Sequence, residues 1–392
     1  MRFPEFSGEW TKTLLNNYLE ENKERNKRGI FTKNHVLSVS GDFGIVNQIE
    51  LLGRSFAGKS VLDYHVVRTG NIVYTKSPLK EYPYGIVKVN GGVDGIVSTL
   101  YAVYKVKETA NGKFVEYYFG LPNRTNRYFK PIVRIGAKHD MKIGNDEVLA
   151  NYVVFPCVEE QKRISDFIGL LDERIATQIK IIEDLKKLKS AISNKLFARK
   201  DFLEKQITMS EIGTLKNGYA FQSSAYNPAG SYKIITIANV SGERYIDIDS
   251  CNCIMRIPND IQAHQALKQD DILISLTGNV GRVSLCTDGN YLLNQRVGLL
   301  QLKQGVNREY IYQALSCRRF EQTMISCGQG AAQMNIGKGD VEDYTIPYSA
   351  NSLNMEVVAS TLKTYDLLIS VEVDRLRLFI QQKQYLLTQM FI

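Results

Sequence analysis

The chain has 392 residues, of which 44% are hydrophobic, so it can bury large cores, and its length suits about two to four domains. It has no run of about 18 or more apolar residues and no apolar stretch at its start, which argues against a membrane span or a secretory signal and predicts a cytoplasmic protein. The net charge of +8 permits a polyanionic partner without requiring one.

Residues 1–157 are predicted to form a mixed α/β domain. An amphipathic stretch from Trp10 to Leu19 leads into the charged run EENKERNKRG, and short β-rich runs follow, punctuated by glycine and proline. These runs are NIVYTK, YGIVKV and GIVSTLYAVYKV.

A long helix is predicted next, over about 159–198, because apolar residues recur there at alternating steps of three and four. Residues from about 200 to 346 are β-rich again, with YKIITIANV, DILISLTGNVGRVSL and RVGLLQLK. A second helix of similar length is predicted over about 352–391. The order of the chain is therefore globular domain, helix, globular domain, helix.

The two halves repeat one another. The segment MKIGNDEV (Met141 to Val148) returns as MNIGKGDV (Met334 to Val341), and the apolar seam of the first helix returns 194 residues later (372 − 178 = 194). Both seams are interrupted by polar residues at the same two places, Gln178/Glu372 and Lys189/Lys383. Because chance does not reproduce interruptions, we infer a duplicated protein.

A narrow apolar stripe suits pairing with one partner helix. We therefore predict that the two helices pack antiparallel, like a coiled coil, about a rough two-fold axis. In that register Lys189 approaches Glu372 and Lys383 approaches Gln178, since polar seam residues fix register. The alternative is that both lysines extend to solvent.

The cysteines and histidines do not follow metal-binding spacing. None of the six cysteines forms a CxxC pair, and the four histidines lie far from them in the sequence. Since zinc sites use closely spaced ligands, we expect reduced thiols and no metal.

An ordered set of motifs resembles the specificity subunit of type I restriction-modification systems. In the second half these are GYAFQSSAY, DDILISLTGNVGR, LNQRV, GQGAAQMNIGKGDV and IPYS; in the first half, YGIVKVNGGVDGIVSTLYAVYKV and FPCVEEQKRISDFIGLLDERI are similar. One departure is that YSANSLNMEVV follows Pro347, where the family has an acidic EEQ turn, kept here only at Glu159, Glu160 and Gln161.

The resemblance implies an α+β fold with four parts: a target-recognition domain over 1–157, a central helix over 158–200, a second recognition domain over 201–348 and a C-terminal helix over 349–392. It also implies a non-catalytic subunit that reads a two-part sequence in double-stranded DNA, one half for each domain. The implied partners are two adenine methyltransferase subunits and ATP-driven restriction subunits. S-adenosylmethionine, ATP and magnesium are expected on those partners, with no cofactor on this chain.

Side chains that suit DNA contact gather in loops of the second domain. Arginine suits guanine, asparagine and glutamine suit adenine, and glycines allow close backbone approach. The candidates here are Thr277, Asn279, Arg282, Asn294, Gln295, Arg296, Gln329, Gln333 and Asn335. Those in the first domain are Lys76, Ser77, Tyr82, Tyr84, Ser98, Thr99, Lys138 and His139. Each of these residues could instead be an ordinary turn residue.

Three other classes of protein compete with this interpretation. GRSFAGKS (Gly53 to Ser60) fits the pattern of a phosphate-binding P-loop, but the β-branched run VLDYHVVRTGNIVY follows it where a helix should open. A methyltransferase would need an adenine-methylating [DNS]PP[YFW] motif, and the nearest string, NPAG, lacks the second proline and the aromatic residue. A coiled-coil scaffold with two protein-binding domains stays open on physical grounds.

Overall fold

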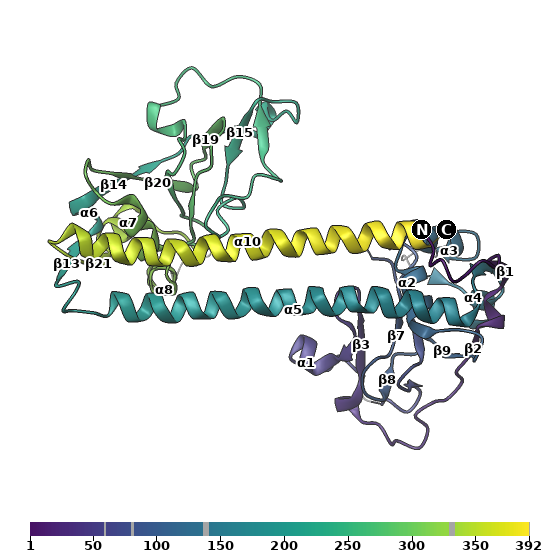
Figure 1. Ribbon diagram of the computed structural model, residues 1–392. Helices are drawn as coiled ribbons and strands as arrows, with labels where there is room; N and C mark the ends of the chain where they lie inside the picture. The colour runs from purple at the N-terminus through teal and green to yellow at the C-terminus, as the bar shows by residue number, and fades with distance from the viewer. Residues whose placement is uncertain (59, 80–81, 136–140, 329–333, 392) are drawn as a thin grey trace. The chain divides into compact units, whose positions relative to one another are not determined.

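The structure, a computed structural model, describes residues 1–58, 60–79, 82–135, 141–328 and 334–391 of an α+β protein. The chain divides into two compact units, Met1–Thr177 with Leu376–Ile392, and Gln178–Arg375. The two long helices are α5 (Val158–Phe197) and α10 (Ser352–Met390), each continuous and each contributing one segment to each unit (Figure 1). Both lie close to the limits predicted from the apolar seams.

The first unit is built on a four-stranded antiparallel sheet in the order β2-β9-β6-β7. Alternate side chains of β6 enter two different cores, as the two-residue period of a strand requires. Ile72 lies in the core that also contains Ile164 and Ile168 of α5, whereas Val73 lies in a second core on the other face. One face of this sheet therefore carries the helix.

The amphipathic stretch near the N-terminus forms a strand, a short 3₁₀ helix and a second strand in succession. The strands of the first unit are β1 (Thr11–Leu14), β2 (Leu19–Glu21), β3 (Leu37–Ser40), β4 (Gly44–Asn47), β5 (His65–Val67), β6 (Ile72–Tyr74), β7 (Val87–Val89), β8 (Gly95–Val97), β9 (Ala102–Val106), β10 (Arg134–Ile135), β11 (Met141–Lys142) and β12 (Tyr152–Phe155). Its helices, besides the long ones, are η1 (Leu15–Asn17), η2 (Lys33–His35), α1 (Gln48–Leu52), α2 (Gly112–Phe119), α3 (Pro122–Phe129) and α4 (Asn145–Leu149).

The second unit contains a four-stranded antiparallel sheet in the equivalent order, β14-β20-β17-β18. Ile272 and Ile274 of β17 pack in a core with Val358 and Leu362 of α10. Leu273 points to the opposite core. The matching strand order shows that the duplication extends from the helices to the sheets.

The second unit contains the following regular elements. Its strands are β13 (Lys205–Thr208), β14 (Gly213–Asn217), β15 (Tyr232–Ile235), β16 (Asn252–Ile254), β17 (Ile272–Ser275), β18 (Val283–Leu285), β19 (Tyr291–Leu293), β20 (Val297–Leu302) and β21 (Thr345–Tyr348). Its shorter helices are α6 (Met209–Ile212), η3 (Ser223–Ala225), η4 (Ala263–Gln265), α7 (Arg308–Leu315), α8 (Arg318–Cys327) and α9 (Lys338–Glu342).

The first turns of the two long helices explain the departure from the EEQ pattern. In α5, the buried Gln161 side chain accepts from Asn111 N at 2.9 Å and donates to Thr109 O at 3.2 Å and to Pro156 O at 3.0 Å. The equivalent residue of α10 is Met355, which is buried in the apolar core. The second copy thus replaces a polar attachment with an apolar one.

The predicted partners of the polar seam residues were wrong. Within the second unit, Gln178 Nε2 donates to Glu372 O at 3.1 Å, and Lys189 Nζ lies 2.6 Å from Asp366 Oδ1. Within the first unit, Lys383 bonds to Asp172. The helix segments run antiparallel in each unit, but each position of α5 faces a residue nearer the N-terminus of α10 than predicted. A slide of a few turns keeps apolar residues opposite one another, so the seam alone did not fix the register.

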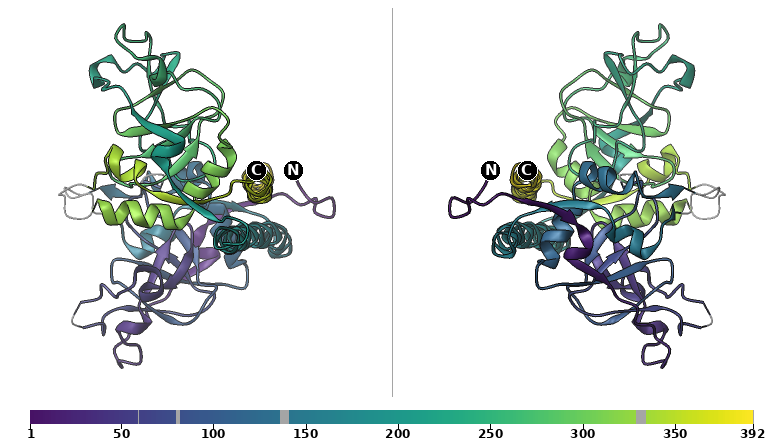
Figure 2. Two further views of the ribbon diagram at one scale, coloured as in Figure 1. Left: turned by 90° about the vertical axis from the view of Figure 1, so that its left-hand side faces the viewer. Right: turned by 90° about the vertical axis from the view of Figure 1, so that its right-hand side faces the viewer.

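Both described chain ends lie in the first unit. The Met1 amino group donates to Gln389 O at 2.5 Å, and Figure 2 shows the two ends close together. Among the described residues, no helix is both long enough and apolar enough to cross a membrane.

Candidate nucleic-acid interface

The hairpin between β17 and β18 holds the first group of predicted DNA-binding residues. Its turn depends on glycine, because Gly278 and Gly281 have φ of 71° and 76°, and a Cβ at Gly281 would lie 2.7 Å from Met324 Cβ. The Ser275 hydroxyl closes the turn by donating to Asn279 O and accepting from Arg282 N at 3.0 Å. The loop is therefore a defined structure that presents its side chains in fixed directions.

Three segments that are far apart in the sequence meet at this hairpin. Leu276 N donates to Arg296 O at 3.0 Å, which joins the hairpin to the turn between β19 and β20. Gly278 N donates to Met334 O at 3.0 Å, and Thr277 forms a β-bridge with Asn335. The backbone thus brings together the motifs SLTGNVGR, NQRV and the described end of GQGAAQMN.

Several predicted residues are exposed at this junction. Asn279, Gln295, Arg296 and Asn335 all present exposed side chains. The Thr277 hydroxyl is buried without a hydrogen-bond partner among the described residues.

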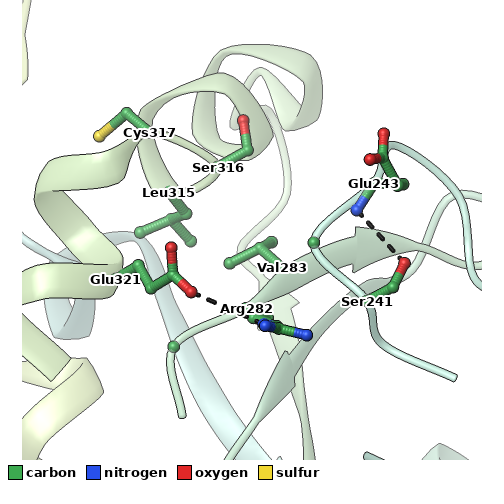
Figure 3. A pocket seen from close by; sticks show the side chains of 10 residues that line it. Ser241, Glu243, Arg282, Val283, Leu315, Ser316, Cys317 and Glu321 are labelled. Carbon is green, nitrogen blue, oxygen red and sulfur yellow. Dashed lines mark hydrogen bonds and ion pairs between the residues drawn. The ribbon is translucent and has the colours of Figure 1, made fainter. Parts of the chain in front are cut away.

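Two predicted residues of this domain have structural contacts instead. Asn294 is 8% exposed, and its Oδ1 accepts from Arg296 N at 3.1 Å, so it shapes the turn that presents Arg296. Arg282 Nε lies 3.6 Å from Glu321 Oε1 beside a cavity of about 230 Å³ (Figure 3). The Asn294 side chain thus supports the turn, and its contact with DNA stays a prediction.

The first domain has a comparable loop junction with fewer free side chains. Tyr74 pairs with Ala102, so the loop after β6 and the turn before β9 leave the same end of the sheet. Lys76, however, is half-buried, and its ammonium donates to Ile143 O at 3.0 Å and to Asn145 Oδ1. Burial lowers the pKa of Lys76 from its ordinary value. The Lys76 ammonium is therefore bonded within its own domain, and its contact with DNA stays a prediction.

The other first-domain candidates are divided between exposed and bonded positions. Thr99 is exposed and Ser98 half-buried in the turn between β8 and β9, and Ser77 is half-buried after Lys76. The Tyr82 hydroxyl donates to Gly120 O at 2.9 Å, and Tyr84 packs against the core of the unit. Lys138, His139, Gln329 and Gln333 lie outside the described residues.

The P-loop-like segment does not have the surroundings of a phosphate-binding loop. Helix α1 ends immediately before it, with Gly53 at the C-cap in the left-handed conformation. The described residues from Ser60 to Tyr64 form no helix, and the next regular element is the strand β5. A P-loop needs a preceding strand and a helix that opens at its lysine, so this geometry argues against nucleotide binding.

Comparisons with known proteins agree with this architecture. Residues 204–376 match the model of the type I restriction modification DNA specificity domain. Over 237 residues the chain is 25% identical to the putative type I restriction enzyme MjaX specificity subunit of Methanocaldococcus jannaschii, covering 56% of this chain and 53% of that protein. The chain thus spans about half the length of the curated relative that it matches.

The fold is similar to that of two solved chains from type I restriction-modification systems over nearly the whole chain. The type I restriction-modification S subunit from M. genitalium superposes with a TM-score of 0.58 at 14% identity, covering 98% of this chain and 96% of that chain. A chain from a structural study of complex assembly and conformational transition in the type I system gives a TM-score of 0.57 at 14% identity, covering 98% of both.

Sequence reasoning missed a polar attachment to the long helices that occurs in both units. Arg244 and Gln313 both bond to Asp366 of α10, and in the first unit Tyr117 bonds to Asp172 of α5. A signal was present, because Asp172 and Asp366 occupy the same place in the repeat (366 − 172 = 194). Both lie beside the apolar seam positions and not on them, so the seam pattern does not indicate them.

Proposed function

We propose that this chain is the DNA-reading subunit of a type I restriction-modification complex. The observation that carries the proposal is the meeting of three distant polar segments at one hairpin, inside the stretch that matches the specificity-domain family. Exposed amides and a guanidinium on a fixed backbone are the groups that read base edges in the major groove. In this proposal Arg296 meets a guanine, and Asn279, Gln295 or Asn335 meet adenines.

The proposed arrangement has a recognition domain in 1–157 and another in 201–348, each reading one half of a split site. The helices of 158–200 and 349–392 pair antiparallel about a pseudo-two-fold axis and set the distance between the half-sites. A contact between equivalent residues supports this arrangement. Gln178 bonds to Glu372, and these two residues occupy the same position in the two repeats.

The chain is proposed to act without chemistry of its own, in the cytoplasm. Two adenine methyltransferase subunits and restriction subunits are its proposed partners, and S-adenosylmethionine, ATP and magnesium are proposed to bind those partners. The basic net charge of +8 suits contact with phosphates.

The test is methylome sequencing of cells that express this chain together with its methyltransferase partner. The expected result is methylation at one two-part sequence. Arg296→Ala should relax one base position in one half-site, by about 1–3 kcal/mol of discrimination. Lys205→Ala is the matched control, since this exposed lysine lies on β13, which pairs with β21 and not with the hairpin.

Binding measurements separate DNA reading from a protein scaffold. Affinity of the assembled complex for duplex DNA should fall steeply with added salt, because phosphate contacts release counterions. Methylation without a two-part pattern, or no salt-dependent DNA binding by the complex, would refute the proposal.

A further inference from the structure

A buried guanidinium joins three parts of the second unit. The Arg244 side chain is 9% exposed and forms two bonds with Glu309 of α7, from Nη2 to Oε2 at 2.6 Å and from Nη1 to Oε1 at 2.8 Å. Its Nη1 also lies 3.1 Å from Asp366 Oδ2 on α10. A planar guanidinium held by one bidentate pair and one further bond fixes orientation as well as distance.

Asp366 is the meeting point of this cluster. It accepts from Gln313 Nε2 of α7 at 2.6 Å and from Lys189 Nζ of α5 at 2.6 Å, in addition to Arg244. The carboxylate side chain is 9% exposed. Because the charges are removed from water and matched by specific partners, losing one of them leaves the others uncompensated.

The backbone of the Arg244 segment is bonded to the hairpin that carries the proposed DNA readers. Leu285 N donates to Arg244 O at 2.7 Å, and the Ser284 hydroxyl donates to Glu243 O at 2.8 Å. Both residues belong to β18, the second strand of that hairpin. A continuous chain of contacts therefore runs from α10 through Arg244 to the loop of Thr277 and Asn279.

Apolar packing joins the hairpin to the first part of α10, because Val283 and Leu285 lie in one core with Val358 and Leu362. Beside Arg244 lies a cavity of about 580 Å³, bordered by Tyr312 on the domain side and by Asp366 and Ile369 on α10. A cavity has no atoms to restrain its walls. Beside this cavity, at Asp366, the polar bonds of Arg244 therefore add a second, directional attachment of the hairpin to α10.

We infer that Arg244 is a positioning residue that, through Glu309 and Asp366, holds the β17–β18 hairpin at a fixed place along α10 and so determines the spacer length accepted between the two half-sites. This inference rests on the proposed function. Successive base pairs are about 3.4 Å apart along the duplex, so a displacement of a few ångströms exchanges one spacer length for another.

The experiment measures methylation by the complete methyltransferase complex on a DNA library with constant half-sites and spacers of every length over one helical turn. The variants are Arg244→Met, which keeps much of the apolar stem, and Asp366→Asn, which keeps the shape of the carboxylate. We expect both to read the unchanged half-sites while their preference for the wild-type spacer over the next length falls by at least about tenfold.

Lys186→Met is the matched control. Lys186 Nζ lies 2.7 Å from Glu243 Oε1, so it joins the same loop to α5, but both side chains are exposed, at 46% and 65%. Exposed pairs contribute little, so this variant should keep the wild-type spacer preference.

Three outcomes would overturn the inference alone: wild-type spacer preference in Arg244→Met, an equal change in Lys186→Met, or uniform loss of methylation at every spacer length in both test variants. The last would indicate a general role in folding. A wild-type complex that methylates no two-part sequence would overturn the proposed function, and the inference with it.

Discussion

The two units use the same lysine–aspartate contact between the long helices, in different environments. In the first unit Lys383 bonds to Asp172, which also accepts from the Tyr117 hydroxyl at 2.7 Å. In the second unit Lys189 bonds to Asp366, which accepts from Gln313. In both units a residue of the short helix that follows the sheet donates to the aspartate.

The difference between the two contacts is burial. The Asp172 side chain is 39% exposed, whereas Asp366 is 9% exposed and has Arg244 as a further partner. Exposed ion pairs contribute little to stability, but breaking a buried pair leaves a charge without compensation. Both repeats keep the contact, and the burial of each copy determines how much it contributes to stability.

The largest expected effect separates the two aspartates. Asp366→Ala should destabilise the second unit by about 3–5 kcal/mol, because Lys189 and Arg244 lose a buried partner. Asp172→Ala should cost about 1 kcal/mol in the first unit. Urea denaturation of the full chain measures both, with Trp10 fluorescence reporting on the first unit and circular dichroism on the whole chain. Equal losses would show that burial does not distinguish the two copies.

Exchanging residues between the repeats tests the attachment of the helix N-termini. Gln161→Met should destabilise the first unit by about 2 kcal/mol, since Asn111 N loses its acceptor. Met355→Gln should cost about 2 kcal/mol in the second unit by burying an amide without partners. Denaturation midpoints check both. If either exchange left stability unchanged, the two first turns would be interchangeable.

A smaller effect is expected from the Tyr117 hydroxyl. Tyr117→Phe removes its bond to Asp172 and should reduce stability by about 1 kcal/mol. Tyr385→Phe on α10 is the control, because Tyr385 is 58% exposed. Thermal unfolding followed by Trp10 fluorescence compares the two. An equal loss of stability in Tyr385→Phe would show that the bond from Tyr117 to Asp172 does not stabilise the first unit.

The smallest effect concerns acid. Burial raises the pKa of the Glu309 carboxyl, but hydrogen bonds from Arg244 and Gln313 outweigh it, so the pKa lies below its ordinary value. A carboxyl with a lowered folded-state pKa stabilises the protein above its unfolded-state pKa, and this contribution is lost as the pH falls through the folded-state value. Stability of Glu309→Gln should therefore decline less steeply than wild type over that acidic range. Parallel declines in pH-dependent denaturation would contradict the assignment.

Local patterns were sufficient for most elements of regular structure. The run NIVYTK contains β6, RVGLLQLK contains β20, and both apolar seams became the long helices. Strand and helix periods are properties of neighbouring residues, so a single sequence displays them. The same holds for the hairpin loop, where glycines mark the turn and place Asn279 at its exposed end.

Individual site residues were harder to assign, because residue type does not reveal burial. Asn294 and Lys76 have side chains that suit DNA, yet one amide is buried and one ammonium is bonded within its own domain. Neighbours from distant parts of the chain produce both outcomes. Within one turn Asn294 is buried, whereas Gln295 and Arg296 are exposed. Residue type does not indicate this difference.

The sequence by itself determined the duplication, the limits of the long helices and the segments that form the candidate interface. Only the tertiary structure decided the register of the helices and the residues that attach each domain to them. The physical reason is that an apolar seam repeats every few residues and matches itself at several offsets. Asp172, Asp366 and Arg244 distinguish one offset from the others, and they do so through contacts between residues more than a hundred positions apart.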